Sequence, residues 1–494
     1  MPVASRAFSR ASVSLLLALL ALVLPAARAQ TWDRDVAPGI VFRMERQENP
    51  ARNLYGLRID PRRVRAESAL AGGTVYAPGP TNGRASVSAM VREHGALGGV
   101  NGDFFQWGDD PGGDPQNLML RGGELLSAPG AGGARAFAAG WTAGTDGLAL
   151  GAATWEGTVS VNGGAPRPLS GLNGRADAGA LVLSTDSAAY AYASTDAVAA
   201  RVRADAAYRL GPEGTPLRGV VTEVAPLAKG VRTRIGPGEF LLVGAAGGKR
   251  GAAADAAVRA LKPGDRLEAK VRVKGFDWAK VREVMGGGPI LLKDGKSALA
   301  PGPNSFADTR HPRTALGRTR DGHLWFVVID GRQTMSTGAT LAETAEALRR
   351  WGCTDAINLD GGGSSALNLL GVTLNRPSGG VERAVANGIL LYGDRPAPAE
   401  AGQPPLALAL PAEPLVVGQA AKVTVTRGGA PVDPARTLYA AQGAAWIDQE
   451  GTLHPVKEGV VEITVLSEGG VARAQVRVGG AQGAPAPAVS PAAG

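Results

Sequence analysis

The sequence predicts an α+β protein, in which a mixed, strand-dominated sheet domain with a few crossover helices is followed by a small β-sandwich. Two observations lead to this prediction. The 494 residues include 71 glycines but only nine phenylalanines, so the core must be built from Ala, Val and Leu on many short elements. Short apolar runs recur between Gly, Pro and Asp turns, as in strands, whereas helical patterns are few.

The N-terminal segment, residues 1–29, is expected to be a signal peptide rather than part of the fold. Arg6 and Arg10 precede an apolar run, and residues 27–29 supply a small-x-small cleavage pattern. The apolar run is too short to span a bilayer stably. We therefore expect the mature chain to begin near Gln30, without stable membrane insertion, and to be secreted, periplasmic or associated with the cell envelope.

Residues 30–394 are expected to form one large domain. The runs at 54–59 and 180–183 have strand character. The clearest helix is predicted at 341–351, because apolar residues recur there on one helical face. Its start and end are marked by a capping-box pair, Thr340 with Glu343, and by Gly352 as a terminator.

The remainder of the chain divides into three parts. Residues 395–405 are rich in Pro and Ala and predict a linker. Residues 406–479 contain short strand-like runs at 421–425, 445–447 and 460–465, separated by glycine turns, and predict a β-sandwich that resembles a bacterial immunoglobulin-like domain. The Ala- and Pro-rich tail, 480–494, is expected to be disordered.

Several classes of function are excluded by composition. Cys353 is the only cysteine, so the chain has no internal disulfide, and we expect this residue to be a small buried hydrophobe. The four histidines lack zinc-binding spacings, which predicts no metal cofactor, with a divalent cation as the alternative. The net charge of +8 is scattered without a basic run, so nucleic acid is not an expected partner.

Two aspartates follow predicted strands on either side of the predicted helix. The apolar run at 323–330 ends at Asp330, and the run at 356–359 ends at Asp360. Strands joined by a crossover helix are usually parallel, so both would finish at one sheet edge. We therefore expect Asp330 and Asp360 to be neighbours in a crevice at that edge, where α/β sheets commonly bind ligands.

Other polar residues cluster around this predicted edge. Asp360 is followed by three glycines and two serines, whose backbone N–H and hydroxyl groups can cradle an anionic oxygen. Arg313 offers a planar fork suited to phosphate. Asn101 and Asp103 flank a glycine and are free to face a ligand.

Six segments occur in the order found in the phosphodiester glycosidase family, which this chain resembles between Leu54 and Tyr392. They are 101–105 (NGDFF), 286–292 (GGGPILL), 311–314 (HPRT), 330–332 (DGR), 358–365 (NLDGGGSS) and 382–387 (ERAVAN). Two departures are an acidic residue of the crossover helix that is replaced near Thr344, and a loose match over 130–275.

The resemblance implies a catalytic domain at 30–394 that cleaves a sugar–O–phosphoryl bond. The phosphate would contact Arg313, Ser364 and Ser365, with Thr314 in support. Asp360 is the first candidate for base or nucleophile, and Asp330 is the second. The remaining candidates would orient the sugar or line the substrate site: Asn101, Asp103, Asn358, Arg383, His311, Gly362 and Gly363. The partner would be a phosphodiester-linked glycan or sugar phosphate of an envelope or extracellular glycan.

Two other functions stay open at this point. A metal-assisted phosphodiesterase would use Asp103, Asp330 and Asp360 as oxygen ligands. A non-catalytic envelope polysaccharide-binding or adhesion protein would use the C-terminal sandwich. No candidate site residue lies beyond Tyr392, so the chain after the linker is expected to be dispensable for the chemistry.

Overall fold

The computed structural model describes residues 29–77, 81–106, 113–129, 137–145, 147–247, 251–396, 402–412 and 414–479. The expectations for residues 1–28, for residues 397–401 of the linker and for the tail lie outside the described residues. Strands dominate the described chain, as predicted. Its α-helices are α1 (Val87–Glu93), α2 (Gly251–Arg259), α3 (Ser305–Asp308) and α4 (Leu341–Arg350). None of these helices has the length and apolar character that a membrane crossing requires.

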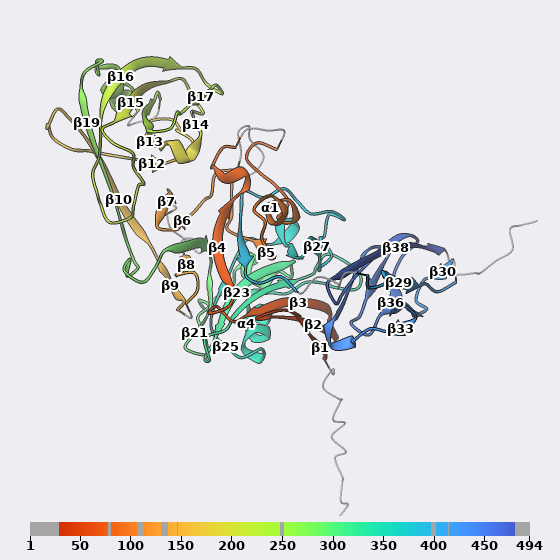
Figure 1. Cartoon of the computed structure of the whole chain (residues 1–494). Coiled ribbons are helices and arrows are strands. Elements are labelled where there is room, and N and C mark those ends of the chain that lie inside the picture. The colour runs from red at the N-terminus through yellow and green to blue at the C-terminus, as the bar shows by residue number, and fades with distance from the viewer. Residues whose placement is uncertain are drawn as a thin grey trace, which may run out of the picture.

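An eight-stranded antiparallel sheet, sheet A, lies at the centre of the molecule (Figure 1). In spatial order its strands are β1 (Gln30–Ala37), β2 (Ile40–Glu48), β3 (Ala51–Ile59), β24 (Leu324–Ile329), β23 (Arg313–Thr319), β25 (Cys353–Asn358), β21 (Ile290–Lys293) and β22 (Lys296–Ser297). The runs predicted at 54–59, 323–330 and 356–359 therefore all form strands of this sheet.

The two predicted Asp-bearing strands run parallel to each other but are not neighbours. Both β24 and β25 pair antiparallel with β23, which lies between them. Adjacent strands are about 4.8 Å apart, so Asp330 and Asp360 leave the same sheet edge about 10 Å apart. The predicted shared edge is confirmed, and the predicted adjacency is wrong because a third strand intervenes.

A second sheet, sheet B, covers one face of sheet A. Its strands in order are β27 (Val372–Thr373), β26 (Leu367–Leu369), β5 (Gly98–Asn101), β28 (Asn387–Tyr392) and β4 (Arg65–Leu70). Alternate residues of β23 and β24, such as Leu316 and Phe326, pack with Val100 and Ile389 of sheet B in one buried cluster. The intervening residues face α4 on the other side of sheet A.

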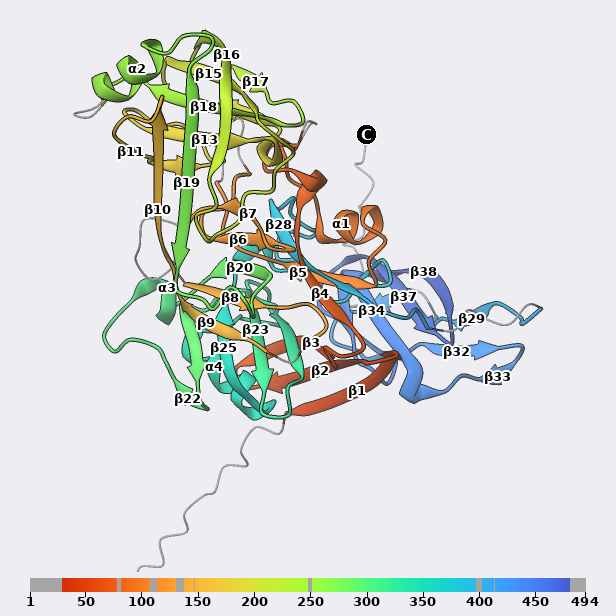
Figure 2. The ribbon, with the colours of Figure 1, turned by 60° about the vertical axis from the view of Figure 1, so that its left-hand side comes forward.

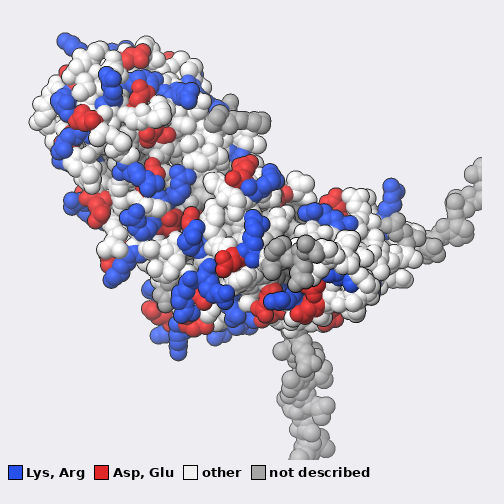
Figure 3. Space-filling view, in the orientation of Figure 1, with Lys and Arg blue, Asp and Glu red and all other residues white. Residues whose placement is uncertain are grey.

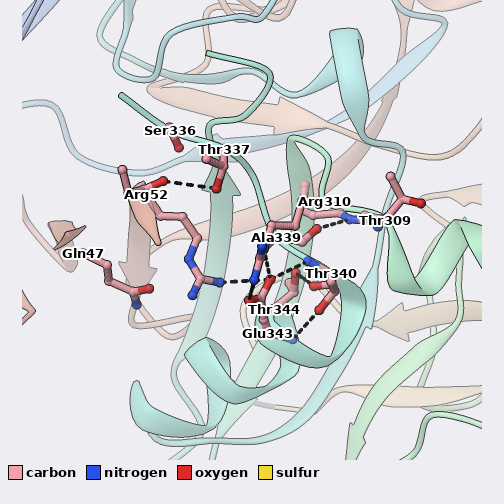
Figure 4. Close-up of polar contacts among 12 residues, drawn as sticks. Gln47, Arg52, Thr309, Arg310, Ser336, Thr337, Ala339, Thr340, Glu343 and Thr344 are labelled. Carbon is pink, nitrogen blue, oxygen red and sulfur yellow. Dashed lines mark hydrogen bonds and ion pairs between the residues drawn. The ribbon is translucent and has the colours of Figure 1, made fainter. Parts of the chain in front are cut away.

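Helix α4 connects β24 to β25 and begins as the sequence predicts. Thr340 Oγ1 accepts a hydrogen bond from the Glu343 N–H, and the Glu343 carboxylate accepts one from the Thr340 N–H. Figure 4 shows that Arg52 and Arg310 also converge on Glu343, at 3.2 and 2.7 Å. One side chain thus caps the helix and ties it to β3 and to the loop before β23.

The part of the chain that lies in sequence between β5 of sheet B and β21 of sheet A forms a lobe of its own (Figures 1 and 2). Its eight-stranded sheet contains β11 (Arg167–Pro168), β10 (Thr154–Val161), β19 (Arg266–Lys274), β16 (Leu217–Leu227), β15 (Ala197–Ala204), β18 (Glu239–Ala245), β13 (Leu181–Thr185) and β12 (Gly171–Leu172). Two smaller sheets adjoin it: β14 (Tyr190–Tyr192) with β17 (Arg232–Arg234), and β7 (Glu124–Ser127), β6 (Met119–Arg121), β20 (Glu283–Gly287), β8 (Phe137–Trp141) and β9 (Ala149–Ala152).

The C-terminal part consists of three small sheets around a core of their own. Their strands are β29 (Leu406–Ala409), β32 (Thr424–Arg427) and β33 (Ala430–Pro431); β30 (Leu415–Val416), β38 (Gly470–Gly479), β37 (Gly459–Ser467) and β34 (Thr437–Gly443); and β31 (Ala421–Lys422), β36 (Thr452–Pro455) and β35 (Ala445–Ile447). Short 3-10 turns occur at η1 (Ala71–Gly73), η2 (Asp186–Ala188), η3 (Gly362–Ser364) and η4 (Pro434–Arg436).

The C-terminal sheets pack against sheet A (Figure 2). Leu438 and Trp446 belong to the same buried cluster as Phe42 and Met44 of β2. Arg34 of β1 donates to the Thr437 carbonyl oxygen at 3.1 Å. The segments on either side of the predicted linker therefore share part of one core. On the face drawn in Figure 3, basic and acidic side chains are interspersed.

Candidate active site

The turn at 360–365 joins the end of β25 to β26 and passes from sheet A to sheet B. Most of its backbone N–H groups are already used within the protein. They donate from Gly361 to Asp360 Oδ1, from Gly362 to the Pro312 oxygen, from Ser364 to the Gly361 oxygen and from Ser365 to the Gly362 oxygen, over 2.8–3.4 Å. The predicted anion cradle of N–H groups is therefore wrong for these four groups.

The glycines of this turn instead allow two arginines to lie against it. A Cβ on Gly363 would stand 2.5 Å from Cζ of Arg383, and one on Gly362 would stand 3.2 Å from Nη2 of Arg332. Arg383 Nη1 also lies 3.5 Å from Ser364 Oγ. Because the two glycines are consecutive, both guanidinium groups lie within roughly 10 Å of each other. The turn thus has cationic groups on two sides.

Arg332 was not a sequence candidate, although it stands in the segment 330–332. It lies two residues beyond Asp330, adopts a left-handed backbone conformation (φ 60°) and is exposed. The sequence signal that could have identified Arg332 is its position just after a strand that ends at the same sheet edge as the strand before Asp360. The structure brings it to the glycine turn.

His311 lies beside Arg332 and is half-buried. Arg332 Nη2 is 3.3 Å from His311 Nδ1. Burial, followed by the charges of Arg332 and Arg313, lowers the pKa of His311. The imidazole is therefore neutral at neutral pH, and we assign its proton to Nε2 so that Nδ1 accepts from the guanidinium.

Two carboxyl groups of the site have contrasting environments. Asp360 is half-buried on the turn, whereas Asp103 is 1% exposed. Asp103 accepts hydrogen bonds from the Phe104 N–H and from the side chain and N–H of Asn117, at 2.7–3.0 Å. Burial nevertheless raises the pKa of Asp103 to about 7, and the Asp360 charge acts in the same direction. One carboxyl thus holds a proton near neutral pH beside another that lies on the turn.

A buried hydrogen-bond network supports the turn from below. Asn101 Nδ2 donates to the Asp360 carbonyl oxygen at 2.6 Å, and Thr314 Oγ1 donates to Asn101 Oδ1 at 2.8 Å. Thr314 Oγ1 also lies 3.1 Å from Ser365 Oγ. These three predicted residues do gather at Asp360, but each is at most 1% exposed. Their polar atoms hold the turn's backbone.

Asn358 fixes the neighbouring glycine segment in the same way. Its Nδ2 donates to the carbonyl oxygens of Gly288 and Leu359 at 2.9 and 2.7 Å. Gly287 has no room for a side chain, because a Cβ there would lie 2.6 Å from the Asn358 carbonyl oxygen. The segment 286–289 is therefore held closely against the strand that leads to Asp360.

Asp330 is enclosed and does not lie open in the predicted crevice. It is 1% exposed and accepts from the Arg376 N–H at 3.0 and 3.2 Å and from Asn375 Nδ2 at 3.1 Å. Burial raises the pKa of Asp330 to about 7. The carboxyl group is thus enclosed beneath the 375–376 loop, and these contacts favour Asp360 over this second candidate for base or nucleophile.

Arg313 is likewise enclosed and does not present its fork to a ligand. Its Nε donates to the Ala339 carbonyl oxygen at 2.9 Å, and Nη2 donates to those of Phe306 and Thr309 at 2.8 Å. Side chains alternate along β23, so Arg313 faces α4 whereas Thr314 faces sheet B and the turn. These contacts do not favour the predicted phosphate clamp, because the guanidinium group already binds the loop before β23.

No group of three or more His, Cys, Asp or Glu side chains among the described residues could hold a metal ion. Asp103, Asp330 and Asp360 therefore do not form the ligand set of the metal-assisted alternative. Cys353 is buried, and burial raises the pKa of its thiol. This agrees with its interpretation as a small hydrophobe.

Comparisons with known proteins place this site in a family context. Residues 228–392 match the model of the phosphodiester glycosidase family. A SPbeta prophage-derived uncharacterized protein of Bacillus subtilis is 39% identical over 99 residues, which are 20% of this chain and 15% of that protein. The N-acetylglucosamine-1-phosphodiester alpha-N-acetylglucosaminidase of Mus musculus is 43% identical over 75 residues, which are 15% of this chain and 14% of the enzyme.

The fold also occurs in a solved structure of a hypothetical protein from Synechocystis. The TM-score is 0.55 at 20% sequence identity, covering 72% of this chain and 62% of that one. The region that matches the family model contains the glycine turn, Asp360, Arg332 and Arg383. This chain spans only a small part of the curated relatives' length. The named relatives of this family are phosphodiester glycosidase hydrolases. Residues 228–392 of the chain are therefore similar to the phosphodiester glycosidase family.

Proposed function

We propose that the protein hydrolyses the bond between C1 of a sugar and the phosphate of a sugar-1-phosphodiester, releasing sugar and a phosphomonoester. One observation carries this proposal: the half-buried Asp360 carboxylate shares a glycine turn with the guanidinium groups of Arg332 and Arg383. The mouse relative, whose name specifies an N-acetylglucosamine-1-phosphodiester, supports the substrate class.

The roles follow from the charges that such a reaction develops. As the C1–O bond breaks, negative charge grows on the phosphate and positive charge grows on C1. Arg332 and Arg383, with Ser364 beside the latter, would bind the phosphate and stabilise it as it leaves. Asp360 would stabilise the cationic sugar and act as base or nucleophile. One water molecule supplies the new hydroxyl group on C1 of the sugar, and its other proton goes to the departing phosphate.

Asp103 would keep the site's charge compatible with a phosphate. With a pKa of about 7, it is largely protonated below neutral pH and does not add a second full negative charge beside Asp360. A phosphate is already a good leaving group, so the reaction needs less help from a general acid than ordinary glycoside hydrolysis does. The buried position of Asp103 suits this indirect electrostatic role.

The setting of the reaction is part of the same proposal. The charged, apolar and small-residue order of residues 1–29 supports export, and an envelope or extracellular glycan is then the accessible substrate. The three sheets at 406–479 support an immunoglobulin-like sandwich.

Product analysis tests the proposed function. The protein is incubated with a UDP-sugar or another sugar-1-phosphodiester, and the products are separated and identified. Free sugar is the expected result, together with UDP from a UDP-sugar or with a phosphomonoester from a simple phosphodiester. Sugar 1-phosphate would instead indicate an enzyme that cleaves the other P–O linkage of the sugar-bearing phosphate. Binding of the glycan without turnover would indicate an adhesion protein. Either of these outcomes would contradict the proposal.

A further inference from the structure

A glutamine of the C-terminal sheets contacts the loop that supports the candidate active site. We propose that Gln442, in β34, is a positioning residue that holds the glycine turn in place through Asn375. This inference rests on the proposed function for its catalytic readout, but its structural consequence can be measured independently.

Gln442 contacts the loop that follows β27. Its Nε2 donates to the carbonyl oxygens of Thr373 and Asn375, at 3.1 and 2.8 Å. The neighbouring Gly443 carbonyl oxygen accepts from Arg376 Nη2. Consecutive residues at the end of β34 thus hold both ends of the 373–376 loop.

Asn375 transmits this restraint to the turn. Its Nδ2 donates to the Ser365 carbonyl oxygen at 3.1 Å and to Asp330 Oδ1 at 3.1 Å. Its Oδ1 accepts from the Leu367 N–H at 2.8 Å. Asn375 is 1% exposed, so water is poorly placed to replace these bonds. The C-terminal end of the glycine turn is therefore fixed by a side chain whose own backbone is held by Gln442.

The arrangement of Asp330 gives the same loop a second anchor. Its carboxylate accepts from the Arg376 N–H, so the loop is held from sheet A on one side and from β34 on the other. Without the Gln442 side chain, the loop loses its hydrogen bonds at Thr373 and Asn375 and keeps those that Arg376 makes with Asp330, Gly443 and Gln333. Displacements of about 1 Å at reacting groups commonly cost about a hundredfold in rate, so a small shift of the turn is sufficient to slow turnover.

Two variants of the full-length chain test the proposal. Gln442→Ala removes the side chain, and Gln442→Glu keeps its shape but replaces the donor with a carboxylate oxygen that faces two carbonyl groups. Gln475→Ala is the matched control, because Gln475 is exposed and its Nε2 donates to Glu462 within the same C-terminal sheets. Turnover of a sugar-1-phosphodiester and hydrogen–deuterium exchange at residues 361–367 are measured well below each variant's Tm.

We expect kcat to fall about tenfold or more in both Gln442 variants, with KM changed by less than about twofold, since the turn moves while the phosphate contacts persist. Exchange at 361–367 should be faster than in the wild type and in Gln475→Ala. Wild-type kcat in the Gln442 variants, or a loss of kcat without faster exchange, would overturn the proposal. If the wild type itself hydrolyses no sugar-1-phosphodiester, the proposed function fails, and the exchange rates alone decide the positioning role.

Discussion

Three arginines near the site carry the same charge but differ in what surrounds them. Arg313 is 2% exposed and donates to three backbone carbonyls, and burial lowers its pKa to about 10. Arg332 is exposed and Arg383 is half-buried, and both lie against glycines of the turn. Residue type and the HPRT segment pointed to Arg313 as the phosphate ligand. Because Arg313 is enclosed by backbone carbonyls, the structure favours Arg332 and Arg383 instead.

Asp360 is expected to be essential for turnover and unimportant for folding. Asp360→Asn keeps the size of the side chain and removes its charge, so kcat should fall by about a hundredfold or more while thermal unfolding changes little. Steady-state kinetics and a melting curve measure the two effects. Asp205→Asn, which removes an exposed carboxylate of the middle lobe, is the control and should keep full activity. Wild-type kcat in Asp360→Asn would show that the site lies elsewhere.

Asp330 is expected to make stability depend on pH. Its folded pKa of about 7 exceeds the usual aspartate value near 4, so the folded state binds a proton that the unfolded state releases between these values. This contribution to stability is complete below about pH 4 and is lost as pH rises through 7, by up to about 1.4 kcal/mol per pH unit. Asp330→Asn removes it. Denaturant unfolding from pH 5 to 7 should then show a less negative slope, and an unchanged slope would argue against a buried, protonated Asp330.

At the scale of single elements, the sequence determines much of what surrounds the site. The capping box of α4 and the strands on either side of it form as predicted because their signals are local. The insertion of β23 between β24 and β25 depends on long-range pairing, which no local pattern specifies. Because side chains alternate along a strand, the sequence could have placed Thr314 and Arg313 on opposite faces of β23. It could not show which face lies against the glycine turn, because that depends on the position of sheet B.

We expect that a methyl group added at Gly363 of the glycine turn leaves folding intact but slows turnover. Gly363 has an ordinary backbone conformation, and the atoms nearest to the added Cβ are those of the flexible Arg383 guanidinium group. Gly363→Ala should therefore fold and displace the guanidinium group, lowering kcat/KM for a phosphodiester by about tenfold or more. Gly211→Ala, where a Cβ meets nothing within 4 Å, is the control. An equal kcat/KM in the two variants would show that Arg383 does not bind the substrate.

At the scale of the whole molecule, the predicted linker at 395–405 divides the sequence into two parts, but these parts share a hydrophobic core. Leu438, Trp446 and Leu466 are buried in the cluster that also contains Phe42 of sheet A. A linker is visible in composition, whereas a docked interface is made of ordinary apolar and polar residues far apart in sequence. The expectation that the C-terminal part is dispensable therefore changes once its contacts are known.

A chain that ends at Asp394 should be less stable than the full-length protein. Removing Leu438, Trp446 and Leu466 from the shared cluster costs roughly 2 kcal/mol for each side chain, so the Tm should fall by several degrees. The restraint on the 373–376 loop is lost as well, so kcat should also fall. Differential scanning calorimetry and kinetics on both chains measure this. A shortened chain with full-length Tm and kcat would restore the original expectation of two independent parts.

The bond that is broken tests the central claim most directly. The account assigns Asp360 to the sugar and Arg332 with Arg383 to the leaving phosphate, so water must add to C1. Hydrolysis of a sugar-1-phosphodiester in H₂¹⁸O, followed by mass spectrometry of both products, locates the solvent oxygen. We predict ¹⁸O in the C1 hydroxyl of the released sugar and none in the phosphomonoester. Label in the phosphate would mean that the P–O bond is cleaved, and would contradict the account.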